Sequence, residues 1–194
     1  MNRNPEYAEV NGHRYKINTD FRYAIECNRI AQDETIGDCE RALGIICVLF
    51  GEDALNNSND YGKLLKVAEK YLTCGKELDN SNEKPDMDFI EDMDYIETSF
   101  QSDYGINLEE TEMHWWKFYN LMNGLSNSEL GDCCILNRIR NLRNYDTKDV
   151  KDPKEKQKIE KAKERVALSK YKKNKKLTKE QEESMEQLNK ILGI

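Results

Sequence analysis

Apolar residues alternate with polar ones near the N-terminus and recur every three or four positions through most of the remaining chain. The first pattern is typical of a half-buried strand and the second of an amphipathic helix. Two alternating runs flank Asn11-Gly12, a pair that accepts the positive φ angles of a type I′ turn. The sequence therefore predicts a two-stranded hairpin over residues 7–17. A hairpin is marginal alone, so Val10, Tyr15 and Ile17 should pack on the helices unless the hairpin pairs with another subunit.

Three helices are predicted to follow the hairpin, over about residues 20–32, 36–50 and 60–74. Thr19 or Asp20 is suited to cap the first of them, because either side chain can accept hydrogen bonds from the free amides of the first turn. The negative charge of Asp20 also suits the positive end of the helix. The second contains the most apolar run of the chain, at 43–50. That run alone would also suit a buried strand, but it continues a helical pattern, so a helix is favoured.

A polar, acidic stretch broken by Pro85 comes next, and residues 76–88 are predicted to be a linker. Apolar residues at helical spacing then predict a helix over 89–104, which Gly105 ends. Residue pairs typical of helix starts predict four further helices. These pairs are Asn107 with Glu110, Ser126 with Glu129, Asp152 with Pro153, and Thr178 with Gln181.

Together these elements predict a mainly α protein, in which a small N-terminal β-hairpin is followed by a helical bundle with a basic C-terminal helical extension. The 194 residues fit one body, 1–147, and one extension, 148–194. The two helices of the extension have only narrow apolar stripes, so they should dock on the body or on a partner. A charged fraction of 35% and a mean hydropathy of −0.90 also indicate that part of the chain lies outside a packed core.

Both tryptophans and two of the five phenylalanines lie within residues 95–125. Large aromatic side chains bury the most area, so we expect the core to be built around this stretch. The candidate residues for core packing or partner binding are Trp115, Trp116, Phe118, Tyr119, Phe100 and Tyr104. For the run from His114 to Trp116, core packing with a hydrogen-bonded imidazole is favoured over a partner-binding patch.

Charge is distributed unevenly along the chain, whose net charge is −7. Residues 77–112 contain thirteen acidic groups and one basic group, whereas 138–179 contain seventeen basic and six acidic groups. Such a division indicates either internal pairing or two differently charged contact surfaces. The candidate basic contact surface consists of Arg138, Arg140, Arg143, Lys172, Lys173, Lys175 and Lys176.

Residues that would support catalysis or metal binding are sparse. The two histidines are far apart in sequence, which disfavours a histidine-based nucleophilic or metal centre. His13 is expected to be solvated. No glycine-rich phosphate loop occurs. None of the six cysteines forms a Cys-x-x-Cys pair, which favours reduced core thiols. Asp92, Asp94 and Glu97 could bind a cation, but a solvated acidic face is favoured. We therefore expect no enzyme activity, no cofactor and no metal.

The chain is expected to act in the cytosol. No apolar run approaches the ~18 residues that a membrane span needs, and no signal peptide follows the first methionine. We therefore expect no membrane association.

Several segments together resemble a known family: residues 11–22, 74–76, 95–108, 113–118 and 123–125. They are similar to the bacteriophage gene-product-fifteen proteins of long-tailed phages and prophages of Gram-positive bacteria. The most specific part is His-Trp-Trp-Lys-Phe at 114–118. The resemblance covers most of the chain. After about residue 150 it lies in the lysine-rich character of the tail more than in the sequence itself.

This resemblance implies a tail assembly chaperone, which coats the tape measure protein while the tail tube polymerises and leaves before the virion matures. The implied partners are the tape measure protein and the tail tube protein, with a paired chaperone product and further copies of the chain as additional candidates. The implied location is the host bacterial cytoplasm. The family has no known catalytic residues to transfer to this sequence.

The main alternative is a nucleic-acid-binding phage accessory protein that uses the basic segment 138–179. That segment offers only Tyr145 and Tyr171 for stacking on bases, and the whole chain is acidic. Nucleic acid is therefore the less favoured partner.

Overall fold

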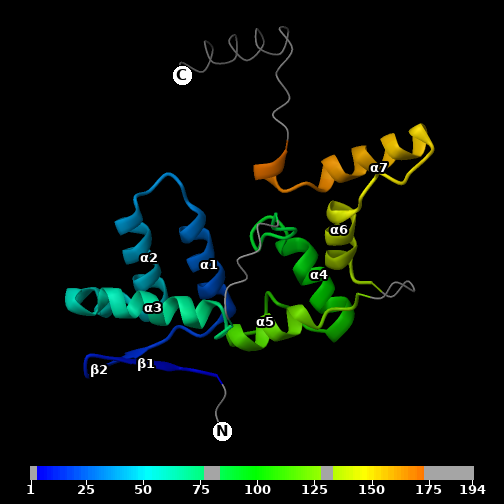
Figure 1. Ribbon diagram of the computed structural model, residues 1–194. Coiled ribbons are helices and arrows are strands. Elements are labelled where there is room, and N and C mark those ends of the chain that lie inside the picture. The colour runs from blue at the N-terminus through cyan, green and yellow to red at the C-terminus, as the bar shows by residue number, and fades with distance from the viewer. Residues whose placement is uncertain (1–3, 77–83, 128–132, 173–194) are drawn as a thin grey trace, which may run out of the picture.

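Seven α-helices and one β-hairpin make up the described part of the chain (Figure 1). The computed structural model describes residues 4–76, 84–127 and 133–172. Over these residues, the predicted mainly α fold with an N-terminal hairpin is confirmed. The helix expected to begin near Thr178 lies outside the described residues.

The hairpin joins β1 (Tyr7–Val10) to β2 (His13–Lys16) in antiparallel register. Its turn residues, Asn11 and Gly12, have φ angles of 51° and 84°, as a type I′ turn requires. The three apolar residues predicted to face the helices are all buried: Val10, Tyr15 and Ile17. The prediction that the hairpin packs on the helical core is therefore confirmed.

Three helices form the N-terminal half: α1 (Phe21–Gln32), α2 (Asp38–Phe50) and α3 (Tyr61–Leu72). Two short 3-10 turns, Glu52–Asn56 and Ser58–Asp60, connect α2 to α3. Of the two predicted caps, Asp20 is the one that caps α1, because its side chain accepts a hydrogen bond of 3.1 Å from the backbone N–H of Arg22. The apolar run before Gly51 is helical, which excludes the strand alternative.

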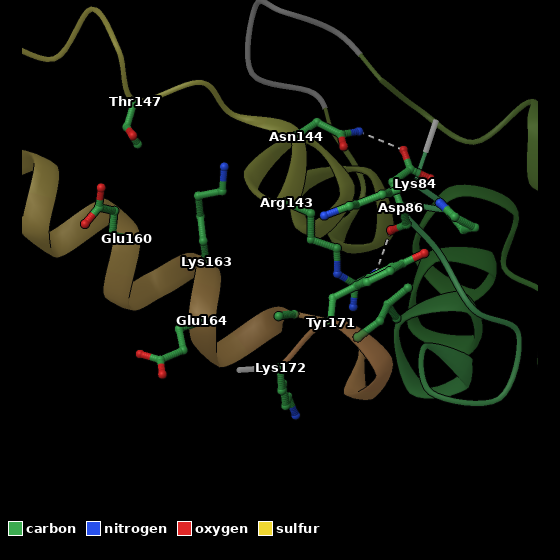
Figure 2. A pocket seen from close by; sticks show the side chains of 13 residues that line it. Lys84, Asp86, Arg143, Asn144, Thr147, Glu160, Lys163, Glu164, Tyr171 and Lys172 are labelled. Carbon is green, nitrogen blue, oxygen red and sulfur yellow. Dashed lines mark hydrogen bonds between the residues drawn. The ribbon is translucent and has the colours of Figure 1, made fainter. Parts of the chain in front are cut away.

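Four helices form the C-terminal half: α4 (Met93–Tyr104), α5 (Trp115–Asn123), α6 (Ile135–Asn144) and α7 (Pro153–Val166). Gly105 ends α4 in a left-handed conformation, with φ of 67°, as predicted. Asp152 caps α7 by accepting a 2.8 Å hydrogen bond from the N–H of Lys154, and Pro153 occupies the first turn. The end of α7 returns to the side of α6 (Figures 1 and 2).

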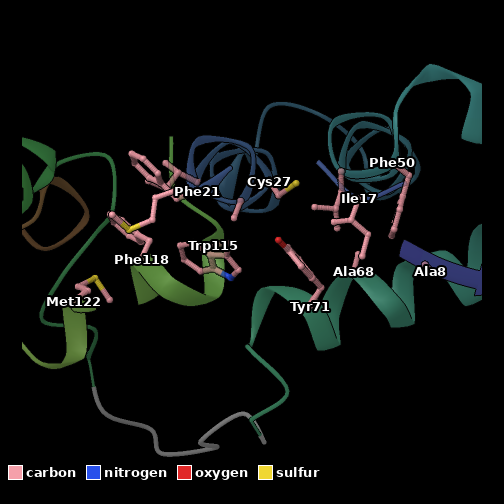
Figure 3. Close-up of a cluster of buried hydrophobic side chains, with 14 of the residues drawn as sticks. Ala8, Ile17, Phe21, Cys27, Phe50, Ala68, Tyr71, Trp115, Phe118 and Met122 are labelled. Carbon is pink, nitrogen blue, oxygen red and sulfur yellow. The ribbon is translucent and has the colours of Figure 1, made fainter. Parts of the chain in front are cut away.

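An aromatic cluster at the centre of the molecule joins the two halves. Phe118 of α5 is fully buried and stacks on Phe21 of α1, with 4.5 Å between ring centroids, and on Phe100 of α4, at 5.1 Å. Trp115 stacks on the same ring at 5.7 Å (Figure 3). The expectation that the core is built around the aromatic stretch is confirmed, because these rings connect helices from both halves.

The prediction that Asn107 and Glu110 open α5 is wrong, because that helix begins at Trp115. Asn107 instead accepts a 3.0 Å hydrogen bond from the N–H of Glu109, within a turn. The true cap is His114, whose Nδ1 accepts a 3.1 Å hydrogen bond from the N–H of Trp116. Its Nε2 lies 3.2 Å from the carbonyl of Pro5, so both ring nitrogens have partners.

A long-range pairing explains the delayed start of α5. Residues just before the helix run alongside the start of α1, where the N–H of Phe21 donates to the carbonyl of Met113 at 2.9 Å. The N–H of Trp115 donates to the carbonyl of Thr19 at 2.8 Å, and the carboxylate of Asp20 accepts from the N–H of Met113 at 3.0 Å. These bonds hold residues 111–114 outside the helix, which no local capping signal could indicate.

Two other helices also begin later than predicted. α6 starts at Ile135 after Cys134 as cap, rather than near Ser126, while Glu129 lies outside the described residues. α4 starts at Met93, and Phe89 lies in a preceding turn although its ring still contacts Trp115, at 5.6 Å between centroids. The apolar periodicity therefore continued beyond the helix itself, because turn residues also pack on the core.

Asp60 is a buried carboxylate that ties the hairpin to the start of α3. It accepts hydrogen bonds from the hydroxyl of Tyr15 at 2.5 Å and the side-chain amide of Asn11 at 2.6 Å, and His13 Nδ1 lies 2.7 Å away. His13 is exposed, as expected, and it also has a specific partner in Asp60. The Tyr15 hydrogen bond, followed by those of His13 and Asn11, lowers the pKa of Asp60 to about 2.

We expect Asp60→Asn to lower the free energy of unfolding at about pH 5 and to lower it by less at about pH 2.5. A depressed pKa in the folded state stabilises the fold above the ordinary value of 3.8, and this stabilisation is lost as the pH falls towards 2. Urea unfolding of both proteins at the two pH values measures the effect. If the urea midpoints of the two proteins differed by the same amount at both pH values, the prediction would be wrong. Asp53→Asn, at an exposed position nearby in the chain, is the control.

Candidate functional site: a cleft between α6 and α7

A cleft of about 630 Å³ lies where α6, α7 and the residues before α4 meet (Figure 2). One side comes from residues 84–86 and another from the end of α6. The third comes from the second half of α7 and the 3-10 turn Ser169–Tyr171. Three segments that are distant in sequence thus converge on one surface depression, which is suited to binding a partner.

Arg143 joins all three segments beneath the cleft. Its guanidinium forms a two-pronged ion pair with Asp92 at 2.7 Å for each nitrogen, and the two side chains are only 10% and 1% exposed. It also donates to the carbonyl of Val166 at 2.6 Å and to that of Asp86 at 2.8 Å. The hydrogen bonds that Arg143 donates to Asp92 raise the pKa of Arg143 above its ordinary value, so the guanidinium stays charged.

Asp86 fixes the edge of the cleft. Its carboxylate accepts a hydrogen bond from Arg140 Nε at 3.1 Å and another from the side-chain amide of Asn144 at 2.9 Å. Asp86 belongs to the stretch predicted to be a linker, and residues 77–83 of that stretch lie outside the described residues. The described end of it is held against α6. Of the two explanations for the opposite charge runs, internal pairing holds for these residues.

The end of α7 is attached to the body by backbone contacts rather than by a buried helix face. No residue of α7 is buried, whereas Leu168 just beyond it is. The N–H and hydroxyl of Ser169 both donate to the carboxylate of Glu91, at 2.8 and 2.9 Å. Lys163 also donates to the backbone carbonyl of Tyr145. These contacts leave the helix largely exposed while fixing one end of it.

An exposed aromatic side chain lines the cleft, beside two lysines. Tyr171 lines it and is 38% exposed, between Lys84 and Lys170, whose Nζ atoms lie 5.4 and 5.3 Å from the ring centroid. Tyr145 and Ile90 are also exposed, at 49% and 46%, but they do not line the cleft. Tyr171 and its neighbouring lysines form a rim that suits an amphipathic protein segment.

The aromatic candidates are mainly part of the core. Phe100, Trp115 and Phe118 are buried, while the remaining three are partly buried: Trp116, Tyr119 and Tyr104. The indole N–H groups of Trp115 and Trp116 donate to the carbonyls of Leu72 and Tyr71, at 3.0 and 2.9 Å. These bonds cap the end of α3. Core packing thus accounts for the run from His114 to Trp116.

The four basic candidates that the structure describes do not form one free basic surface. Arg138 is exposed, whereas Arg140 and Arg143 are engaged in the ion pairs with Asp86 and Asp92. Lys172 lines the cleft. The other three, Lys173, Lys175 and Lys176, lie outside the described residues. The solvated face expected at Asp92 is wrong for that residue, because its charge is buried against an arginine.

Sequence reasoning missed the cleft because its parts come from three separate segments. The only signal was the pair of opposite charge runs, which does not indicate which side chains meet. Among the described residues, no group of histidine, cysteine, aspartate and glutamate side chains is arranged to hold a metal ion. All six thiols are free, and burial raises the pKa of Cys27 to about 12, so this thiol is unreactive.

A family model described as Bacteriophage Gp15 protein matches residues 2–168. The chain belongs to the Bacteriophage Gp15 protein family. The match extends through α7 to Leu168, so it includes most of the residues that build the cleft of this Gp15 protein. Comparisons with curated proteins and with solved structures give no match. Within the described ranges, no helix combines the length and apolar character needed to cross a bilayer.

Proposed function

We propose that this Gp15 protein is a non-enzymatic tail assembly chaperone that binds the tape measure protein and assists polymerisation of the tail tube. The observation that supports this most directly is the cleft between α6 and α7. It combines exposed Tyr171 and its neighbouring lysines with a floor fixed by Arg143. An amphipathic helix could place its apolar face on this rim and its acidic residues near the lysines.

Exposed rather than enclosed apolar side chains suit a transient partner. A chaperone must release its client, so contacts should be of moderate area and accessible to solvent. The ring of Tyr171 is 38% exposed, which meets that requirement. The protein would act in the host cytoplasm and be absent from the mature virion. Further contacts with the tail tube protein, a paired product or other copies of the chain belong to the same proposal.

The nucleic-acid alternative has less support than the sequence alone gave it. Two of the three arginines of α6 are held in ion pairs with aspartates, so their charge is not available to phosphate groups. The remaining positive side chains of α7 are interspersed with glutamates. No described surface combines them with a row of stacking aromatic residues.

We expect Tyr171→Ala to bind the tape measure protein at least about tenfold more weakly than wild type, because it removes the exposed aromatic side chain of the cleft. Binding is measured with the purified full chain and tape measure segments from the same phage. Tyr23→Ala on α1 is the matched control, since Tyr23 is 45% exposed and does not line the cleft.

Two results would count against the proposal. If wild type binds no tape measure segment, the chaperone function is wrong. If wild type and Tyr171→Ala bind equally, the client contacts another surface. Retention on a generic DNA duplex that falls steeply with salt would instead support the alternative.

A further inference from the structure

Residues 177–194 combine a helical repeat of apolar positions with acidic charge. The apolar positions are Met185, Leu188, Ile191 and Leu192, and the acidic ones are Glu180, Glu182, Glu183 and Glu186. Lys190 is the single basic residue after Glu180. A stripe this narrow cannot stabilise a helix in water without a surface to cover it.

The cleft offers a surface of matching character. Tyr171 and Ala167 contribute apolar atoms to its lining, together with the basic side chains of Lys84, Lys163 and Lys172. None of these three lysines forms an ion pair with a carboxylate among the described residues. Glutamates also line part of the α7 side, so the positive charge is concentrated towards Lys84 and Lys172 rather than spread evenly (Figure 2).

This segment begins close in sequence to a residue that lines the cleft. Lys172 lines the cleft itself, and only residues 173–176 separate it from Leu177. Four residues span at most about 14 Å. A segment tethered this closely has an effective concentration of the order of millimolar, so even weak affinity fills the site.

We propose that residues 177–194 bind in the cleft between α6 and α7 of the same chain, with the apolar stripe on the Tyr171 side and the glutamates near the lysines. The proposal rests on the proposed function in one respect: the segment then imitates the client helix and occupies its site. Client binding displaces it, so the free chaperone keeps its apolar rim covered.

Displacement has a measurable consequence. A client that binds only the open form has an apparent dissociation constant equal to its intrinsic value divided by the open fraction. If the segment leaves about one tenth of the molecules open, removing its contacts strengthens client binding about tenfold. Glu182→Lys/Glu183→Lys should therefore bind the tape measure protein more tightly than wild type.

Zero-length cross-linking of the full chain tests the contact without any client. A water-soluble carbodiimide couples carboxylates to amines only when they touch, and a mixture of unlabelled and 15N-labelled chains separates links within a chain from links between chains. We expect amide links within one chain from the segment's glutamates to Lys84 or Lys163. Lys84→Arg/Lys163→Arg keeps the charge but removes the amines, so these links should disappear.

The outcomes are distinct. Links only to Lys170 or later lysines would overturn the proposal, because those residues adjoin the segment in sequence. Links that join labelled to unlabelled chains would overturn it in favour of exchange between copies. If the links within one chain form but the tape measure protein does not bind, the segment's contact stands and the proposed chaperone function fails. If Glu182→Lys/Glu183→Lys loses the links yet binds client as wild type does, the regulatory role fails.

Discussion

Arg143→Met should lower the free energy of unfolding by about 3–5 kcal/mol, the usual cost of leaving one member of a buried ion pair without its partner. The Asp92 carboxylate would be left without its arginine in a site that is 1% exposed, with a backbone N–H from Asp88 as the remaining donor at 3.0 Å. The carbonyls of Asp86 and Val166 would lose their donors at the same time. Urea unfolding followed by far-UV circular dichroism measures the loss.

Arg138→Met is the matched control, because Arg138 lies on the same helix and is exposed. It should change the stability by no more than about 0.5 kcal/mol. The double variant Asp92→Leu/Arg143→Met should recover part of the stability, since it removes the isolated charge. A loss below about 1 kcal/mol in the single variant would show that water enters and solvates the aspartate. Trypsin should also cut the lysines of α7 sooner in Arg143→Met.

Phe118→Ala should lower the free energy of unfolding by about 3–5 kcal/mol, the range measured for deleting a buried phenylalanine ring. Its ring lies between Phe21 and Phe100 and also meets Trp115, so truncation leaves a cavity at the junction of the two halves. Tyr145→Ala, at an exposed aromatic position, should change the stability by less than about 0.5 kcal/mol.

The same variant tests whether the halves unfold together. Because the stacked rings belong to α1, α4 and α5, we expect one transition that moves to lower urea without changing its slope. Two separate transitions in Phe118→Ala would contradict the view that this ring couples the halves. A loss under about 1.5 kcal/mol would mean that neighbouring side chains fill the space.

Local signals in the sequence predicted the elements that depend on local geometry. The positive φ angles at Asn11 and Gly12 and the left-handed Gly105 are consequences of single residues, and both predictions are confirmed. The Asp152-Pro153 start of α7 belongs to the same group. In each case neighbouring residues supply the hydrogen bonds that the signal requires.

The sequence could not predict features that depend on distant partners. α5 begins eight residues after Asn107 because residues before it pair with the start of α1. Arg143 and Asp92, 51 positions apart, meet only after α4 and α6 pack together. Opposite charge runs indicated that pairing was available, but the choice of partners required three-dimensional positions. The cleft depends on the same pairing, so it was unpredictable for the same reason.

The two indole groups at the end of α3 determine what intrinsic fluorescence can report. The chain contains only two tryptophans, and both donate to carbonyls of that helix at the junction with α5. Neither lines the cleft. Tryptophan emission will therefore change when the α3–α5 junction separates during unfolding. It will change little when a partner binds beside α7. A dye placed near Tyr171 is needed to observe docking optically.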